Sequence, residues 1–289
     1  MEQFFQQVVN GVMVGSSYAI VALGFGLTFS VMHVLNLAHP ETAMVGAFAA
    51  FVVATLFTTN LLVVIPLAVL AALLAGLLIE RLAIRPTRGR HILTSFIATG
   101  GLSIVMQNGA QRIFGVDPVR VAVQVEGVQT VGGVIASNMQ LMTFGLAVAM
   151  MVGARYYVRN TRWGRATRAV SEKHEVAQAL GVDINRVSQL TVGLSTAMAG
   201  AAGVSLALLH SQATPFMGAI FGTKSFVCML VAGNRHIEGI MFVGILLGVL
   251  EALVAGYISA SLRDMVAFGI LVLVLYLRPA GIFGSYEHD

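Results

Sequence analysis

The sequence predicts an all-α integral membrane protein, a polytopic helical bundle with about eight or nine membrane-embedded segments, some of which could be broken or re-entrant. Of the 289 residues, 57% are hydrophobic and only 10% are charged, whereas a soluble domain carries about 25% charged residues. Uncharged runs of about 20 residues, long enough to cross the hydrocarbon core as helices, follow one another along the chain. A membrane β-barrel would instead show short alternating segments.

The apolar runs define the expected spans in order. The run 42–79 is long enough for two spans, with the turn expected at 58–60. Lys224 interrupts the run 216–233, so this segment could be broken or re-entrant, with Lys224 at the end of a half-helix. The other runs each provide one span: 8–32, 92–111, 140–158, 187–209, 240–260 and 265–277.

Basic residues set the expected orientation. Four arginines lie within 81–90 and seven of the 17 Lys and Arg residues lie within 155–186. Such clusters mark cytoplasmic loops. The Gly- and Val-rich linker 114–138 would then lie outside, as a small hairpin, and the C-terminus inside. Because the basic clusters flank membrane spans, they argue against a nucleic-acid partner.

Motifs of catalysis are missing from the sequence. It contains no G-x-x-x-x-G-K-[ST] nucleotide-binding loop, no G-x-S-x-G nucleophile turn and no H-E-x-x-H zinc motif. His33, His39 and Glu41 match no zinc spacing. The single cysteine, Cys228, provides no disulfide. We therefore expect no enzyme activity, no metal and no cofactor.

Small residues predict close helix packing. The G-x-x-x-G spacing, which lets helix backbones approach one another, occurs at Gly11/Gly15, Gly218/Gly222 and Gly244/Gly248. The spacing indicates a tightly packed bundle and says nothing about chemistry.

Polar residues at membrane depth are costly, so they are candidates for function or for pairing. Asn36, His39 and Glu41 interrupt apolar sequence beside Pro40. They predict either a broken segment near a substrate path or a short interfacial loop with snorkelling side chains. Gln107, Asn108 and Gln111 form a second cluster at helical spacing, which could line a pathway or bond neighbouring helices. Glu251 is expected to pair with a neighbouring helix.

The most charged segment, 161–187, separates two long apolar runs. A basic arm surrounds Trp163, and a short helix is expected from Ala169 to Leu180, with Gly181 ending it. An apolar stripe of Val170, Ala177 and Leu180 would suit the groove of a partner protein. The alternative is a solvated loop helix that meets only lipid headgroups.

Three blocks of sequence resemble the permease subunits of ABC importers of the branched-chain, or hydrophobic, amino acid family. The charged segment reads GRATRA from Gly164, then Ala177, Gly181-Val182-Asp183 and Arg186, close to the family pattern G-R-A-x-R-A followed by A-x-x-x-G-[IV]-[ND]. The first span is followed by NLAHPE, and the last third contains PFMGAIFGTKSF and LYLRPAGIFG. The blocks recur in order over essentially the whole chain.

This resemblance implies a single transmembrane permease domain, 1–289, in the bacterial cytoplasmic (inner) membrane, with a cytoplasmic coupling loop at 159–187. The implied partners are a second homologous permease subunit, two cytoplasmic ATPase subunits that bind the ATP, an extracytoplasmic substrate-binding protein and the lipid bilayer. The implied coupling helix contains Arg165, Ala169, Glu172, Ala177, Leu180 and Gly181. The expected substrate pathway contains Asn36, His39, Glu41, Gln107 and Asn108.

One departure from the family pattern leaves the cargo less certain. Where the family has a Gly-rich turn after its lysine segment, this chain has Asn234-Arg235-His236-Ile237-Glu238. The main expectation is import of branched-chain or other hydrophobic amino acids. The alternatives are a permease for urea or short amides in the same class, or a self-sufficient channel or ion-coupled carrier.

Overall fold

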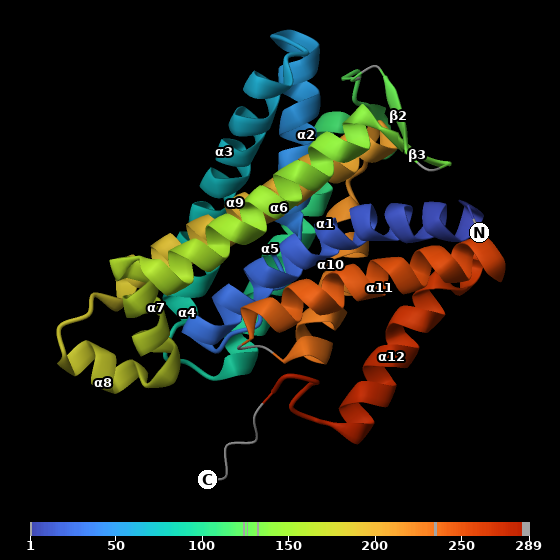
Figure 1. The fold of residues 1–289 in the computed structure, drawn as a ribbon. Helices are drawn as coiled ribbons and strands as arrows, with labels where there is room; N and C mark the ends of the chain where they lie inside the picture. Colours follow the sequence, from blue (N-terminus) through green and yellow to red (C-terminus); the bar gives the residue numbers. More distant parts are fainter. Residues whose placement is uncertain (1, 124, 126, 132, 234–235, 285–289) are drawn as a thin grey trace.

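The computed structural model describes residues 2–123, 125, 127–131, 133–233 and 236–284, and it is a helical bundle (Figure 1). The described part contains nine long helices, and these provide the predicted membrane segments: α1 (Glu2–Met32), α2 (Glu41–Leu56), α3 (Leu61–Ile79), α5 (Ile92–Phe114), α6 (Asn138–Asn160), α9 (Ile184–His210), α10 (Met217–Ala232), α11 (Ile237–Tyr257) and α12 (Arg263–Leu277). Shorter helices connect them: η1 (Glu80–Ile84), α4 (Arg85–Thr87), α7 (Arg162–Glu172), α8 (His174–Ala179) and η2 (Ala260–Leu262).

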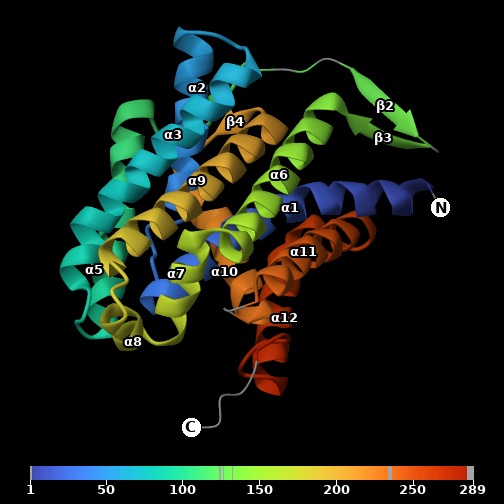
Figure 2. The same cartoon turned by 60° about the vertical axis from the view of Figure 1, so that its left-hand side comes forward.

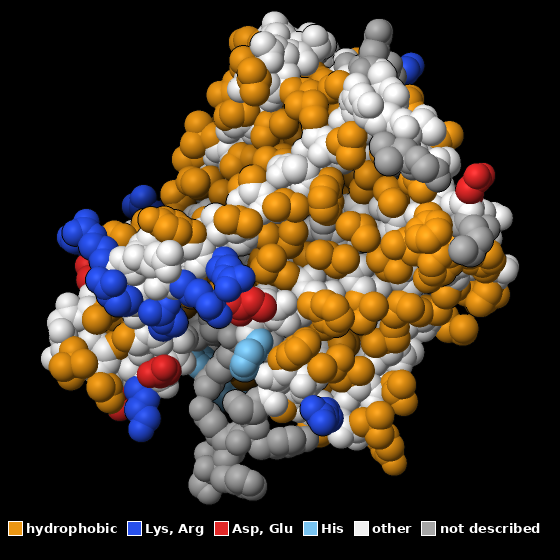
Figure 3. Space-filling view, in the orientation of Figure 1, with side chains coloured by type: hydrophobic (Ala, Val, Ile, Leu, Met, Phe, Trp, Pro, Cys, Tyr) orange, Lys and Arg blue, Asp and Glu red, His pale blue; other side chains and the backbone are white. Residues whose placement is uncertain are grey.

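Among the described residues, six helical stretches are long and apolar enough to cross a membrane, and α2 and α10 are shorter apolar helices of 16 residues each. Leucine, isoleucine, valine and phenylalanine side chains cover much of the outer surface (Figure 3). An apolar outer face of this extent is what a lipid environment requires, because a soluble protein rarely exposes large apolar patches.

Helix α1 lies at the centre and packs along α11 (Figure 1). Glycines make the close approach possible. A methyl group on Gly15 would lie 2.8 Å from the carbonyl oxygens of Gly244 and Ile245, and one on Gly11 would lie 2.8 Å from the Gly248 carbonyl oxygen. Two of the predicted G-x-x-x-G pairs therefore pack against each other.

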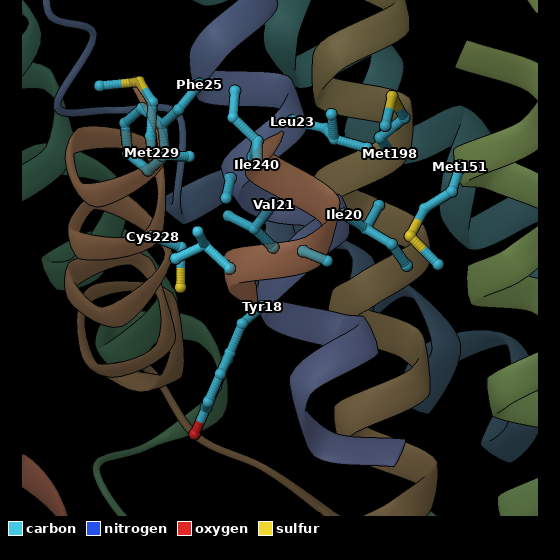
Figure 4. Close-up of a cluster of buried hydrophobic side chains, with 14 of the residues drawn as sticks. Tyr18, Ile20, Val21, Leu23, Phe25, Met151, Met198, Cys228, Met229 and Ile240 are labelled. Atoms are coloured by element: carbon cyan, nitrogen blue, oxygen red, sulfur yellow. The ribbon is translucent and has the colours of Figure 1, made fainter. Parts of the chain in front are cut away.

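Helix α9 lies between two groups of helices. It packs against α1 and α6 on one side and against α2 and α3 on the other, as the turned view in Figure 2 shows. The main core lies where α1, α6, α9, α10 and α11 meet (Figure 4). Its labelled side chains are Tyr18, Ile20, Val21, Leu23, Phe25, Met151, Met198, Cys228, Met229 and Ile240.

The linker between α5 and α6 forms the predicted hairpin, from β2 (Val128–Val131) and β3 (Val134–Ser137), which pair antiparallel. A second small sheet joins β1 (Val119–Arg120) to β4 (Gln212–Ala213). The Gln6 side chain exchanges two hydrogen bonds of 2.8 Å with the backbone of Ile135 in the hairpin. The start of α1 and the hairpin therefore lie at the same end of the molecule.

The two basic loops lie together at the opposite end. Arg88 donates a 2.8 Å hydrogen bond to the Asn185 side chain, which joins the loop before α5 to the start of α9. Basic side chains gather around α7 and the end of α6 on the face shown in Figure 3. This shared end agrees with the predicted orientation, in which both loops face the cytoplasm and the hairpin faces outside.

Two expectations for the helices are wrong. The segment around Lys224 is not broken, because α10 is continuous and Lys224 lies in its middle. The single helix expected from Ala169 to Leu180 is two helices, since Lys173 adopts an extended backbone (φ −145°, ψ 104°) between α7 and α8. The basic arm around Trp163 is itself helical, as the first turns of α7.

We expect Gly15→Ala to destabilise the bundle by about 1–3 kcal/mol, because overpacking of a close interface forces the backbones apart. Gly153→Ala on α6 is the matched control, since nothing lies within 4 Å of an added methyl group there. The measurement is the thermal unfolding temperature of the purified chain in detergent. Equal temperatures for the two variants would contradict the tight α1–α11 contact.

Candidate functional site

The chain leaves helical geometry between α1 and α2, at the predicted NLAHPE element. His33 has a positive φ of 52°, and residues 33–36 are extended or irregular. A tight turn follows, in which the Glu41 N–H donates to the Ala38 carbonyl (3.2 Å) and the Thr42 N–H to the His39 carbonyl (3.1 Å). Pro40 is the N-cap of α2, a position at which its missing N–H costs nothing.

This break lies inside the protein. Asn36, His39 and Glu41 are 2%, 0% and 1% exposed. The His39 ring packs edge-on against Phe25 at 4.7 Å and its Nε2 lies 3.3 Å from the Val21 carbonyl oxygen of α1. The interpretation as an interfacial loop with snorkelling side chains is therefore wrong, because snorkelling requires the polar ends to reach water.

Glu41 joins the break to α5. Its Oε1 accepts hydrogen bonds from Gln107 Nε2 (2.7 Å) and Ser103 Oγ (3.0 Å). On the other side lies α10, where a methyl group on Gly218 would stand 2.7 Å from Glu41 Oε2. The second residue of this glycine pair, Gly222, packs against Pro40. The third G-x-x-x-G pair, Gly218 and Gly222, therefore packs against the residues of the break and not against another long helix.

Three buried polar atoms of the break have no hydrogen-bond partner among the described residues: Asn36 Nδ2, His39 Nδ1 and Glu41 Oε2. A buried polar group without a partner costs about 1–3 kcal/mol. Such groups are rare in folded proteins, and their concentration in six residues marks this break as the strongest candidate for a binding element.

The structure brings together only part of the predicted pathway. Asn36, His39, Glu41 and Gln107 share one buried region, but Asn108 points away. Its side chain is exposed and donates to the Ile104 carbonyl of its own helix (2.8 Å). Ser103 was not among the predicted residues, although its position four residues before Gln107 places both on one face of a helix.

A second buried polar cluster joins α1, α10, α11 and α12. Lys224 Nζ lies 3.0 Å from both Glu251 carboxylate oxygens and 3.0 Å from Asp264 Oδ1, and the Tyr18 hydroxyl donates to Glu251 (3.0 Å). The prediction that Glu251 pairs with a neighbouring helix is confirmed. The expectation that Lys224 lies at the end of a half-helix is not met, because it pairs from mid-helix.

Caps and packing contacts stabilise the charged segment at the basic end. Thr161 caps α7 by accepting a 2.9 Å hydrogen bond from the Gly164 N–H, and Gly181 turns the chain after α8 with φ 84°. The buried side chains Val170 and Ala177 pack with Val31 and Val187, at the ends of α1 and α9. The segment is therefore fixed to the helices that carry it.

The outer face of the segment is exposed. Leu180 is 79% exposed and Val176 is 52% exposed, so the expected apolar stripe is split: Val170 and Ala177 face inward, and Leu180 faces outward. Arg165 and Glu172 are also exposed, and Ala169 is partly buried. Exposed apolar side chains flanked by charges are typical of a surface that meets another protein.

Ion pairs join α6 to the start of α11. Glu238 Oε1 lies 2.6 Å from Arg159 Nη2 and 3.6 Å from Arg155 Nε. Glu238 belongs to the turn that departs from the family pattern, of which Asn234 and Arg235 lie outside the described residues.

A helical membrane bundle with a buried, unwound polar break, and with an anchored loop helix at its basic end, is the arrangement expected of a membrane transport protein. The family model described as "Branched-chain amino acid transport system / permease component" matches residues 7–275. The chain belongs to this family, and it is a membrane-spanning permease subunit of an ABC importer, located in the cytoplasmic membrane.

Curated relatives span the whole chain. The high-affinity branched-chain amino acid transport system permease protein BraD of Pseudomonas aeruginosa is 35% identical over 299 residues, which cover 98% of this chain and 97% of BraD. LivH of Escherichia coli K12, with the same description, is 34% identical over 98% of this chain and 96% of its own length. A probable branched-chain amino acid transport permease of Methanocaldococcus jannaschii is 25% identical, covering 96% of this chain and 92% of its own.

We expect Glu251→Ala to lower stability by about 3–5 kcal/mol, because it leaves the buried Lys224 ammonium without its main partner. The double variant Lys224→Met/Glu251→Leu should recover most of this loss, since it removes both charges. Asp264→Asn is the control: Asp264 is 71% exposed, and surface pairs contribute about 0–1 kcal/mol. Thermal unfolding of the purified variants measures all three; a double variant no better than Glu251→Ala would contradict the pairing.

Proposed function

We propose that this chain translocates branched-chain or other hydrophobic amino acids inward, driven by separate ATPase subunits. The observation that carries the proposal is the similarity over 98% of the chain to permeases described as branched-chain amino acid transporters. No observation favours urea, short amides or a self-sufficient channel.

The energy must come from partners, because the sequence has no nucleotide-binding loop of its own. ABC importers combine permease, ATPase and substrate-binding proteins. We infer two cytoplasmic ATPase subunits, which bind the ATP, an extracytoplasmic substrate-binding protein and a second homologous permease subunit. The chain itself would need no cofactor.

The segment α7–α8 is our candidate for the coupling element. Ala177 anchors it to the bundle, and Leu180, Val176 and Arg165 remain free for an ATPase surface, whereas the exposed Glu172 lines the neighbouring cavity between α1, α6, α7 and α11. Gly181 and Ala169 would set its shape. Since the anchor lies at the ends of α1 and α9, a push on α8 reaches the two helices that carry the core.

The break at Asn36–Glu41, with Ser103 and Gln107, is our candidate for the substrate path. Its unpaired amide, imidazole and carboxylate groups are suited to the ammonium and carboxylate of an amino acid. The structure holds these groups closed, at 0–2% exposure. Transport would therefore require α5 or α10, which cover Glu41, to move away from it.

The decisive experiment is uptake by proteoliposomes that contain this chain with its ATPase, binding-protein and second permease partners. Leucine, an aromatic amino acid and urea are compared as radiolabelled cargo. We expect ATP-dependent uptake of leucine and none of urea. Urea uptake, or leucine uptake without ATPase subunits, would overturn the proposal.

We expect Gln107→Leu to lower leucine uptake about tenfold, because Glu41 loses a hydrogen bond donated to its charge, worth about 1.5–3 kcal/mol. Asn108→Leu, one residue along the same helix and facing away, should remain within about twofold. Uptake is normalised to the amount of chain in the membrane. Equal losses in both variants would remove Glu41 from the path.

We expect Gly181→Trp to abolish ATP-driven uptake while the chain stays in the membrane, because an indole would cover the docking face. Gly89→Trp is a matched control: Gly89 also has a positive φ (78°), lies in the other basic loop and has nothing within 4 Å. The strain of a non-glycine residue is thus similar in both. Co-purification with the ATPase separates lost docking from misfolding, and normal uptake by Gly181→Trp would refute the assignment.

A further inference from the structure

A cavity of about 350 Å³ opens at the basic end, between α1, α6, α7 and the start of α11. It is separate from the break and from the Lys224 cluster. Its size lies at the lower end of the range of small-molecule pockets, about 300–1,000 Å³. Figure 3 shows basic, acidic and histidine side chains meeting apolar surface at this junction.

The floor of the cavity is aliphatic. Leu23 and Leu27 of α1 and Ile240 of α11 line it and are 5% exposed or less. Val158 and Ile237 continue the same surface. The cavity therefore reaches into the bundle and is not a groove on its surface.

The rim of the cavity is polar and its formal charges balance. It carries two arginines, Arg159 and Arg168, and two glutamates, Glu172 and Glu238. Arg159 is paired with Glu238, and Arg168 donates to the Val158 carbonyl with one guanidinium nitrogen, which leaves its other N–H groups for a ligand. Hydroxyl groups of Ser30, Thr167 and Ser171 lie among them; each donates to a carbonyl of its own helix and keeps its lone pairs as acceptors. A site for a simple anion or cation would carry an excess of the opposite charge.

An aliphatic floor below paired positive and negative groups matches one class of small molecule. A free α-amino acid with a branched aliphatic side chain has a carboxylate, an ammonium group and an apolar chain joined at one carbon. We propose that this cavity binds such an amino acid from the cytoplasm. Arg168 takes the carboxylate beside the Arg159–Glu238 pair, Glu172 takes the ammonium, and Leu27, Val158 and Ile237 enclose the side chain.

Occupancy would act on coupling. The bound amino acid touches α7, which is part of the candidate coupling element α7–α8. It also touches α1, α6 and α11. It therefore holds α7 against α1, α6 and α11, the helices relative to which α7 has to move during transport. Cytoplasmic amino acid then slows import, so the site limits accumulation of the product. This part rests on the proposed function.

Binding is tested first on the purified full chain in nanodiscs, with radiolabelled leucine. Isovalerate and 3-methylbutylamine, which each keep one charge of leucine, should compete at least tenfold more weakly. Ser30→Phe fills the cavity and should remove binding, whereas Ser261→Phe, an exposed serine of η2 at the far end, should not. Glu172→Gln removes the proposed partner of the ammonium group, so it should weaken leucine binding about tenfold and leave isovalerate binding unchanged.

Transport is tested second, in the proteoliposomes described above, with leucine preloaded inside. Internal leucine should lower the initial rate of uptake several-fold, and Ser30→Phe should relieve this. Leucine uptake that ignores internal leucine refutes the inference and leaves the proposed function intact. If the proteoliposomes take up no leucine at all, but the chain binds leucine saturably and Ser30→Phe abolishes that binding, the proposed transport function is refuted and the binding site stands. Absence of saturable leucine binding overturns the proposal. Loss of ATPase association in Ser30→Phe assigns the cavity to the ATPase-docking surface and overturns it as well.

Discussion

The contact between α1 and α11 determines where every other functional element lies. Glycines at matched positions let two backbones approach without side chains between them, which fixes both the separation and the register of the two helices. Because α1 is held in this way, Val21, Gly24 and Phe25 form a rigid wall for His39. The end of α1 also packs against α7, so a single helix contacts both the buried break and the segment at the basic end.

The spans, the break and the basic ends could be predicted from the sequence because each depends on composition or on one strong local signal. Long uncharged runs can only be helices in lipid, and Pro40 beside Glu41 interrupts them. The element against which each glycine motif packs could not be predicted, because all three motifs have the same spacing and the spacing does not specify a partner. Gly11 and Gly15 meet α11, whereas Gly218 and Gly222 meet a proline and a carboxylate.

The errors have the same origin in tertiary contacts. Lys173 follows a good helical pattern with no glycine or proline, and yet the chain is extended there, with Val170 and Ala177 on either side packing into the same small cluster. Lys224 looked like a helix breaker because a charge in lipid is costly. Glu251, Asp264 and Tyr18 come from three other helices, and no local pattern shows that they remove this cost.

Two of the apolar helices beside the break, α2 and α10, are short. At about 1.5 Å per residue, the 16 residues of α2 and of α10 each rise roughly 24 Å, less than the roughly 30 Å of a hydrocarbon core. These helices pack against each other, and both touch the break at Pro40 and Glu41. Neither helix alone is long enough to cross a hydrocarbon core of average thickness, and both end next to buried polar groups. On the proposed path, a cargo molecule at Glu41 would be separated from water by a short helix, α10, whose Gly218 and Gly222 already lie against Glu41 and Pro40.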